Sequence, residues 1–93
     1  NEMYDKAIET FLISLDTYKK IGSKIGSLSG QARQLANIGL TYYNMKEYDK
    51  ALFNLQAAKK IFEECKLNRD VYRMEAIIAE IEQQLKKSKP DEK

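Results

Sequence analysis

The sequence predicts an all-α fold of about four antiparallel helices. Apolar residues recur at every third or fourth position along most of the chain, and no segment shows the alternation of a half-buried strand. Residues that break helices are few, since there are four glycines and the only proline is Pro90. Three of the glycines fall within GSKIGSLSG at 22–30, together with three serines. We therefore predict an interior loop over 22–30.

Two helices are predicted before the middle of the chain. The first covers 2–21 and stops before Gly22, a suitable C-terminal cap; its apolar residues are Tyr4, Ala7, Ile8, Phe11, Leu15, Tyr18 and Ile21. The second covers 30–45, and its apolar residues are Leu35, Ile38, Tyr42 and Met45. Each set occupies one face of a helix.

Two more helices are predicted in the second half of the chain. The third covers 48–66, with apolar residues Tyr48, Ala51, Leu52, Leu55, Ala58, Ile61, Phe62 and Cys65. Because so few residues separate it from the second, the two should be antiparallel neighbours. The fourth covers 70–87, with Asn68 or Asp70 as its N-cap; its apolar residues are Val71, Met74, Ile77, Ile78, Ile81 and Leu85. The final residues, 88–93, contain no apolar side chain, so we expect a frayed tail.

Composition narrows the classes of function. The chain has 93 residues, enough for one small domain, and a net charge of +2, which is too small for a nucleic-acid surface. No apolar run approaches the roughly 20 residues of a membrane span. A single cysteine, Cys65, allows no internal disulfide, which favours a cytoplasmic location. Because the chain begins at Asn1 rather than Met, we interpret it as a segment of a longer protein.

The chain contains an internal repeat. The tetrapeptide YDKA occurs at Tyr4–Ala7 and again 44 residues later, at Tyr48–Ala51. This offset also aligns pairs of matching size: Phe11 with Leu55, Ser14 with Ala58, and Tyr18 with Phe62. The second and fourth helices align best 40 residues apart, with Arg33 on Arg73, Ile38 on Ile78 and Gly39 on Ala79. Helical hairpins that repeat at this interval are typical of stacked helical arrays.

The second and third helices resemble the tetratricopeptide repeat (TPR) family. They read Leu35-x2-Ile38-Gly39-x2-Tyr42 and then Ala51-x3-Leu55-x2-Ala58, which is similar to the pattern W-x2-L-G-x2-Y followed by A-x3-F. The resemblance implies hairpins stacked in a right-handed superhelix. On this reading 31–66 is a complete repeat, and 2–21, which contains Ala7-x3-Phe11, is the second helix of a preceding one.

The match to the family has departures. The closing proline is absent, Glu63 stands near its place, and the spacing exceeds 34 residues. These traits resemble the longer-period variants of kinesin light chains, Leu-Gly-Asn-type scaffolds and bacterial peptide-sensing regulators. In 70–87, Glu75 and Glu82 replace large residues of the pattern, so this segment is a following or a capping helix.

Gly39 and Ala51 are small at the point where the two helices of a hairpin should approach closely. A methyl group at Gly39 would push the pair apart, at a cost of about 1–3 kcal/mol. A glycine within a helix otherwise lowers stability by roughly 1 kcal/mol relative to alanine. We therefore expect Gly39 to be a contact position; the alternative is that it is neutral.

Catalytic chemistry is nearly absent from the sequence. There is no histidine, so Cys65 lacks the imidazole that usually activates a thiol, and we expect it to be a small core residue. Metal sites built on His or paired Cys are excluded by these counts. The segment 22–30 does not match a phosphate-binding loop. We predict a protein that is not an enzyme and needs no cofactor.

The TPR resemblance implies a concave groove lined by the first helix of each hairpin. On 30–45 the residues expected to face it are Arg33, Ala36, Leu40, Tyr43 and Asn44, and on 70–87 they are Arg73, Ala76, Glu80, Gln83 and Gln84. The two arginines stand in the first turns of their helices, where a cation opposes the helix dipole. They could therefore pair with a ligand carboxylate. The alternative is that both are ordinary exposed arginines, with Arg73 paired to Asp70.

The groove composition bears on the kind of partner. Family members that clamp a C-terminal carboxylate use Lys and Asn where this chain has Ala36 and Leu40, which favours a peptide or helix with an apolar anchor. We predict a protein-interaction scaffold that binds a protein or peptide and neither nucleic acid nor membrane. A peptide-sensing module attached to an output domain and a plain dimeric helical bundle stay open. The broad apolar belt of 2–21, which includes Leu12 and Ile13, also predicts self-association.

Overall fold

The computed structural model describes residues 1–21 and 25–87, and these form four α-helices. Their bounds are α1 Glu2–Ile21, α2 Ile25–Asn44, α3 Tyr48–Glu64 and α4 Asn68–Lys87. No strand occurs within these two ranges, so the predicted all-α class is confirmed for them. The tail expected over 88–93 lies outside the described residues.

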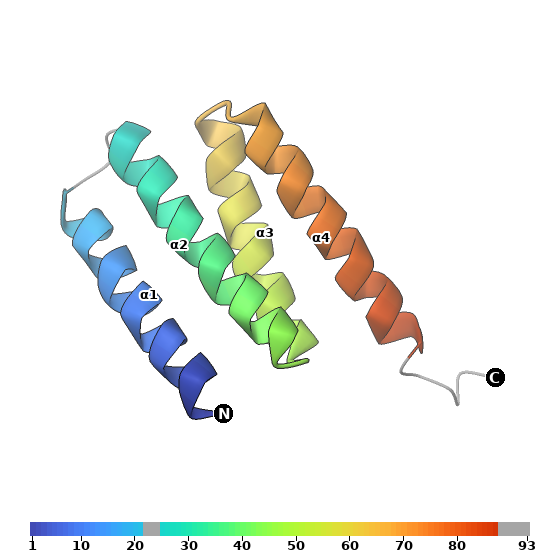
Figure 1. Ribbon diagram of the computed structural model, residues 1–93. Coiled ribbons are helices and arrows are strands. Elements are labelled where there is room, and N and C mark those ends of the chain that lie inside the picture. The colour runs from blue at the N-terminus through green and yellow to red at the C-terminus, as the bar shows by residue number, and fades with distance from the viewer. Residues whose placement is uncertain (22–24, 88–93) are drawn as a thin grey trace.

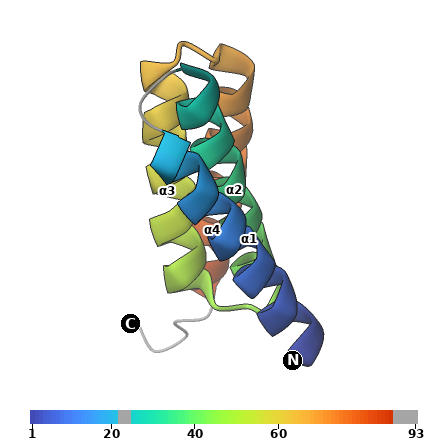
Figure 2. The ribbon, with the colours of Figure 1, turned by 90° about the vertical axis from the view of Figure 1, so that its left-hand side faces the viewer.

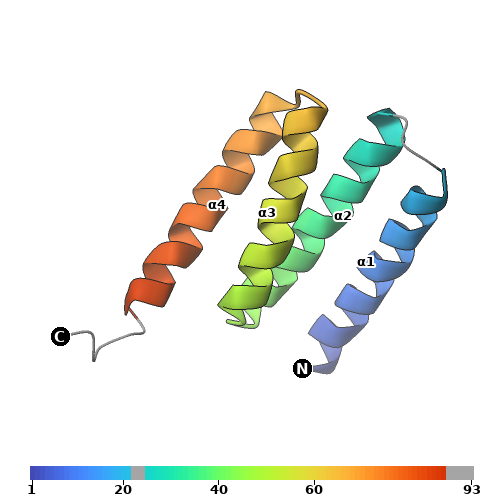
Figure 3. The same cartoon turned by 180° about the vertical axis from the view of Figure 1, so that it is seen from behind.

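The helices follow one another in chain order, from α1 at one edge to α4 at the other (Figures 1 and 3). Each packs against the next, giving the pairs α1–α2, α2–α3 and α3–α4. Figure 2 views this row from the edge formed by α1. The Cα atoms span 49 × 32 × 16 Å, so the row is thin in one direction. The central helices α2 and α3 are covered on two sides, whereas α1 and α4 pack chiefly on one neighbour each.

The hydrophobic core lies among α2, α3 and α4. Its largest fully buried side chains are Phe62, Leu55, Met74 and Ile81. Small residues fill the space between them, and the core cluster contains Ala32, Ala36, Ala51, Leu55, Ala58, Phe62, Met74, Ile78 and Ile81. An ion pair of 3.3 Å between Lys59 Nζ and Glu75 Oε2 joins α3 to α4 at its border. The amphipathic spacing seen in the sequence therefore produces one continuous core.

Gly39 lies where α2 and α3 approach most closely, as predicted. A Cβ placed there would stand 2.7 Å from Leu55 Cγ and 3.2 Å from the Ala51 carbonyl oxygen. Of the positions that carry the resemblance on these two helices, Ile38, Ala51, Leu55 and Ala58 are buried, and Leu35 and Tyr42 are partly buried against the core. On α1, Ala7 and Phe11 are only half-buried. The small residues therefore mark real contacts between helices.

The start of α2 corrects the predicted loop over 22–30. Residues 25–30 are helical, so this prediction is wrong for them, while 22–24 lie outside the described residues. Small side chains are what allow the first turns of α2 to lie against α1. A Cβ at Gly30 would overlap the Tyr18 ring, and the Ser27 hydroxyl donates a hydrogen bond to the Tyr18 carbonyl. Gly30 and Ser27 therefore reflect close packing between helices rather than a break in the helix.

The α2–α3 and α3–α4 connections are two copies of one turn, 20 residues apart. In the first, Lys46 N–H donates to the Tyr43 carbonyl and Glu47 N–H to the Tyr42 carbonyl. In the second, Lys66 and Leu67 donate to Glu63 and Phe62 in the same pattern. This is the Schellman motif that ends many helices. The first of its two donor residues takes a positive φ and is usually glycine. In both turns this residue is a lysine, with φ of 65° at Lys46 and 60° at Lys66.

These turns also shift two predicted details. Because α3 ends at Glu64, Cys65 lies in the turn and is half-buried, so the prediction of a core helical cysteine is wrong. The helix α4 begins at Asn68, and the Asp70 carboxylate in its first turn pairs with Arg73. Because the Leu67 carbonyl accepts the first bond of this helix, from Val71 N–H, Leu67 is the N-cap, and the predictions of Asn68 and of Asp70 are both wrong.

Candidate functional site

The predicted groove residues of α2 form a face with an apolar centre and polar ends. Leu40 and Tyr43 are partly buried and pack against the core cluster. Arg33 and Asn44 flank them and are exposed. Ala36 is only 6% exposed and belongs to the core, so it supports this face without being accessible on it. Leu40 and Tyr43 thus leave part of an apolar surface open between two polar groups.

The two arginines that align in the sequence have different surroundings. Arg73 Nη1 donates a hydrogen bond of 3.2 Å to Asp70 Oδ1, so this side chain already has a carboxylate partner one turn away. Arg33 is exposed, and within 1–21 and 25–87 it has no ion-pair partner. Of the two, Arg33 is the one available to an external anion. The alternative in which Arg73 is an exposed arginine paired to Asp70 is therefore confirmed.

The predicted groove residues of α4 are mainly a polar surface. Glu80 and Gln83 are exposed. Glu80 Oε2 accepts a hydrogen bond of 3.0 Å from Gln84 Nε2 on the same helix. Because α3 packs against both α2 and α4, the two sets of predicted residues belong to helices that share a neighbour. The α4 set offers hydrogen-bonding groups but no apolar anchor.

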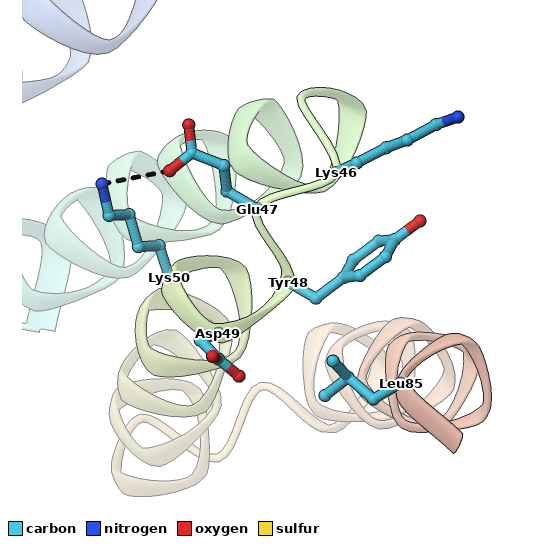
Figure 4. Close-up of a pocket in the computed structure, with 6 residues that line it drawn as sticks. All are labelled: Lys46, Glu47, Tyr48, Asp49, Lys50 and Leu85. Atoms are coloured by element: carbon cyan, nitrogen blue, oxygen red, sulfur yellow. Dashed lines mark ion pairs between the residues drawn. The ribbon is translucent and has the colours of Figure 1, made fainter. Parts of the chain in front are cut away.

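A depression that sequence reasoning missed lies where α3 begins and α4 ends. It measures about 470 Å³ and is lined by Lys46, Glu47, Tyr48, Asp49, Lys50 and Leu85 (Figure 4). The Tyr48 ring also meets the Tyr43 ring, with centroids 5.9 Å apart, which connects this depression to the α2 face. Nothing in the local sequence places Leu85 beside Tyr48. The site depends on the packing of α4 along α3.

One ion pair lies at this depression. Lys50 Nζ lies 3.0 Å from Glu47 Oε1 and 5.5 Å from the centre of the Tyr42 ring. The hydrogen bond to the Glu47 carboxylate, and then its negative charge, raise the pKa of Lys50 above its ordinary value. The ammonium group is therefore held in its charged form and beside Glu47.

The described residues contain neither a side-chain cluster for a metal ion nor a membrane-crossing helix. Within 1–21 and 25–87, no three His, Cys, Asp or Glu side chains lie close enough to hold a metal ion. The same part of the chain has no helix with the length and apolar character needed to cross a bilayer. The carboxylates of Glu63 and Glu64 are exposed on α3. The site with the clearest chemical character is therefore the α2 face.

Comparisons with known proteins inform the fold only. No family model matches the sequence, and no curated protein matches it. Among solved structures, the chain is similar to the designed protein DA05, known from solution NMR, with a TM-score of 0.83 and 22% sequence identity. The match covers 100% of this chain and 89% of that chain. At this identity the likeness supports the four-helix all-α fold, and function has to be argued from the site.

Proposed function

We propose that this chain is a non-catalytic, TPR-like interaction module that binds a peptide or a helical segment of a partner protein. The proposed surface is the α2 face, with Leu40 and Tyr43 at its centre. In this proposal α1 is the second helix of one hairpin, α2 and α3 form a complete hairpin, and α4 follows or caps it. The contact of Gly39 with Leu55 and Ala51, at the positions of the repeat pattern, supports this assignment.

The observation that carries the function is the half-buried pair Leu40 and Tyr43 beside the exposed Arg33. An apolar side chain of a partner would lose water against the two residues, and the guanidinium would pair with a partner carboxylate. A binding site needs few polar groups of this kind to fix orientation. The preferred ligand is thus a short segment with a large apolar residue and a nearby acidic one.

A peptide-display selection followed by calorimetry tests the proposal. Selected peptides should combine an apolar anchor with Asp or Glu. Arg33→Glu should weaken their binding by roughly tenfold or more, because a charge-assisted hydrogen bond becomes a repulsion. Arg69→Glu is the matched control, since Arg69 is an exposed arginine outside the proposed face. Equal binding by the wild type and Arg33→Glu would refute the proposed site.

The same peptides distinguish the scaffold from a peptide-sensing regulatory module. A scaffold keeps the spacing of its helices on binding, whereas a sensor changes it. Spin labels on α1 and α4 would measure that distance with and without peptide. The proposed cytoplasmic location rests on the lone Cys65 and is independent of these tests.

A further inference from the structure

One flank of α1 carries an uncharged stripe along its whole length. Its members are spaced alternately by four and three residues, which places them on one face of the helix; they are Met3, Ala7, Thr10, Ser14, Thr17 and Ile21. The two large side chains at its ends are widely open to solvent, with Met3 78% and Ile21 59% exposed. The stripe borders the buried face of α1: Ile8 and Leu15 are the buried residues, and Ala7 and Ser14 within the stripe are half-buried.

Two of the three hydroxyl groups within this stripe, those of Thr10 and Thr17, already have hydrogen-bond partners. The Thr10 hydroxyl donates a hydrogen bond of 3.0 Å to the Lys6 carbonyl. The Thr17 hydroxyl does the same at 3.1 Å to the Ile13 carbonyl. Each hydroxyl is turned back onto its own helix, which leaves the methyl group of the threonine to the surface. A partner could cover both residues without leaving a hydroxyl donor unsatisfied.

One end of the stripe is hollow and the other protrudes. A depression of about 380 Å³ lies among Ile13, Ser14, Thr17, Tyr18 and Ile21. At the opposite end of the same helix stands the long, unbranched side chain of Met3, which is nearly free of contacts at 78% exposure. A methionine adapts readily to an irregular apolar hollow. The helix thus bears both an apolar protrusion and a hollow that such a protrusion could fill.

The sizes and the spacing of the stripe residues follow the same pattern in both directions. Large residues occupy the two ends, small residues occupy the four central places, and the spacing is symmetric about position 12. If two copies of α1 lie antiparallel about a two-fold axis, Met3 of each copy comes level with Thr17 to Ile21 of the other. The small central residues then allow the helices to approach closely. A surface that fits its own copy in this way is the requirement for an isologous interface.

The charges along one border of the stripe fit the same arrangement. Near the start of α1 this border carries Glu2, and near the end it carries Lys20. An antiparallel axis at position 12 brings Glu2 within two residues of Lys20 of the second copy, so opposite charges lie near each other at both ends of the interface. Lys20 and Asp16 already pair within the chain at 3.2 Å, so both are oriented along this border.

We propose that α1 is a self-association surface and that its occupant is α1 of a second copy, antiparallel and related by a two-fold axis. Met3 of each copy fills the hollow of the other, and Glu2 pairs with Lys20 across the interface. This surface lies on α1, away from the α2 face proposed to bind peptides, so the two proposals stand independently. Because two single helices bury less than the roughly 1,200 Å² of a standard interface, the dimer is weak and reversible.

Sedimentation equilibrium between about 10 µM and 1 mM tests the proposal. The wild type should convert from monomer to dimer across this range. Ile13→Glu, which places a carboxylate beside the hollow, should remain monomeric throughout. Leu12→Glu is the matched control, because Leu12 is 50% exposed, similar to Ile13 at 64%, but faces away from the stripe. A monomeric wild type at 1 mM, or equal loss of association in both variants, would overturn the proposal.

A charge exchange tests the antiparallel arrangement. Glu2→Lys and Lys20→Glu should each weaken the dimer by roughly threefold to tenfold, and the double variant should regain most of that loss. The two residues lie about 27 Å apart along one helix, so the recovery can arise only between copies. Circular dichroism of each variant checks that the helices persist. A double variant that associates no better than either single variant would overturn the antiparallel pairing.

Discussion

The helices α1 and α3 share the tetrapeptide YDKA in their first two turns but are buried to very different extents. In α3, Ala51, Leu55 and Ala58 are fully buried. Their counterparts 44 residues earlier, Ala7, Phe11 and Ser14, are only half-buried. The difference lies in the neighbours, because α3 is packed between α2 and α4 whereas α1 packs on α2. Similar amphipathic sequences therefore form a core in the middle of the row and a surface at its edge.

The largest expected effect is the difference in stability cost between truncating Leu55 and truncating its counterpart Phe11. Leu55→Ala should destabilise the protein by about 3–4 kcal/mol, because it opens a cavity in a fully buried site. Phe11→Ala removes a larger side chain but should cost only about 1–2 kcal/mol, because Phe11 is half-buried. Urea denaturation of both variants measures the two free energies. A cost for Phe11→Ala equal to that for Leu55→Ala would contradict the distinction between centre and edge.

Three glycines of α2 extend the comparison along one helix. Gly39→Ala should cost about 1–3 kcal/mol, since the new methyl group meets Leu55 and the Ala51 backbone in the packed centre. Gly30→Ala should cost less, because the group it meets is the Tyr18 ring of the edge helix, which can shift.

Gly26→Ala is the control for these two substitutions. A Cβ at Gly26 meets nothing within 4 Å, so this change should stabilise the helix by roughly 0.5–1 kcal/mol. Thermal unfolding of the three variants gives the ranking. A cost for Gly30→Ala above that for Gly39→Ala would show that α1 is as firmly held as α3.

The α2–α3 and α3–α4 turns should respond alike when their lysines are replaced by glycine. Lys46 and Lys66 have positive φ, which costs a residue with a side chain about 1 kcal/mol. Replacing either with glycine should raise the free energy of unfolding by roughly 0.5–1 kcal/mol after the added chain entropy of glycine is included. Denaturant midpoints measure both changes. A loss of stability at either position would mean that the lysine side chain makes a contact worth more than the backbone strain.

The smallest expected effect concerns Lys50 at the start of α3. Its pKa is raised by Glu47, so the folded state binds this proton more tightly than the unfolded state does. The contribution to stability is complete below the unfolded pKa and is lost as the pH rises through the folded pKa, above about pH 10. In Glu47→Gln, the part of the free energy of unfolding that is lost at alkaline pH because Lys50 deprotonates should be smaller. Unfolding curves between pH 8 and pH 11 compare the variant with the wild type.

The sequence predicted the number of helices, their order and most of their bounds, because the apolar spacing reports directly which face is buried. It also predicted that Gly39 is a contact position. The loop over 22–30 was predicted wrongly for 25–30 because Gly and Ser have low helix propensity, while here Gly30 and Ser27 are small to accommodate Tyr18. Propensity describes a residue alone and cannot include a contact made by another helix.

The site was less predictable than the fold. The exposed Arg33 and the half-buried Leu40 and Tyr43 were identified from the repeat pattern, and their placement on one face follows from helical spacing. The depression between Tyr48 and Leu85 was missed, since it joins residues far apart in the chain. The two turns were missed as well, because lysine has no preference for positive φ.

Native-state hydrogen exchange, measured residue by residue at a concentration where the protein is monomeric, tests the central claim most directly. The amides of α3 should exchange only through global unfolding, because the helix is covered on both sides. Those of α1 should exchange through a local opening that requires at least about 2 kcal/mol less. Equal protection of α1 and α3 would contradict the account, because it would mean that the edge helix is held as firmly as the central one.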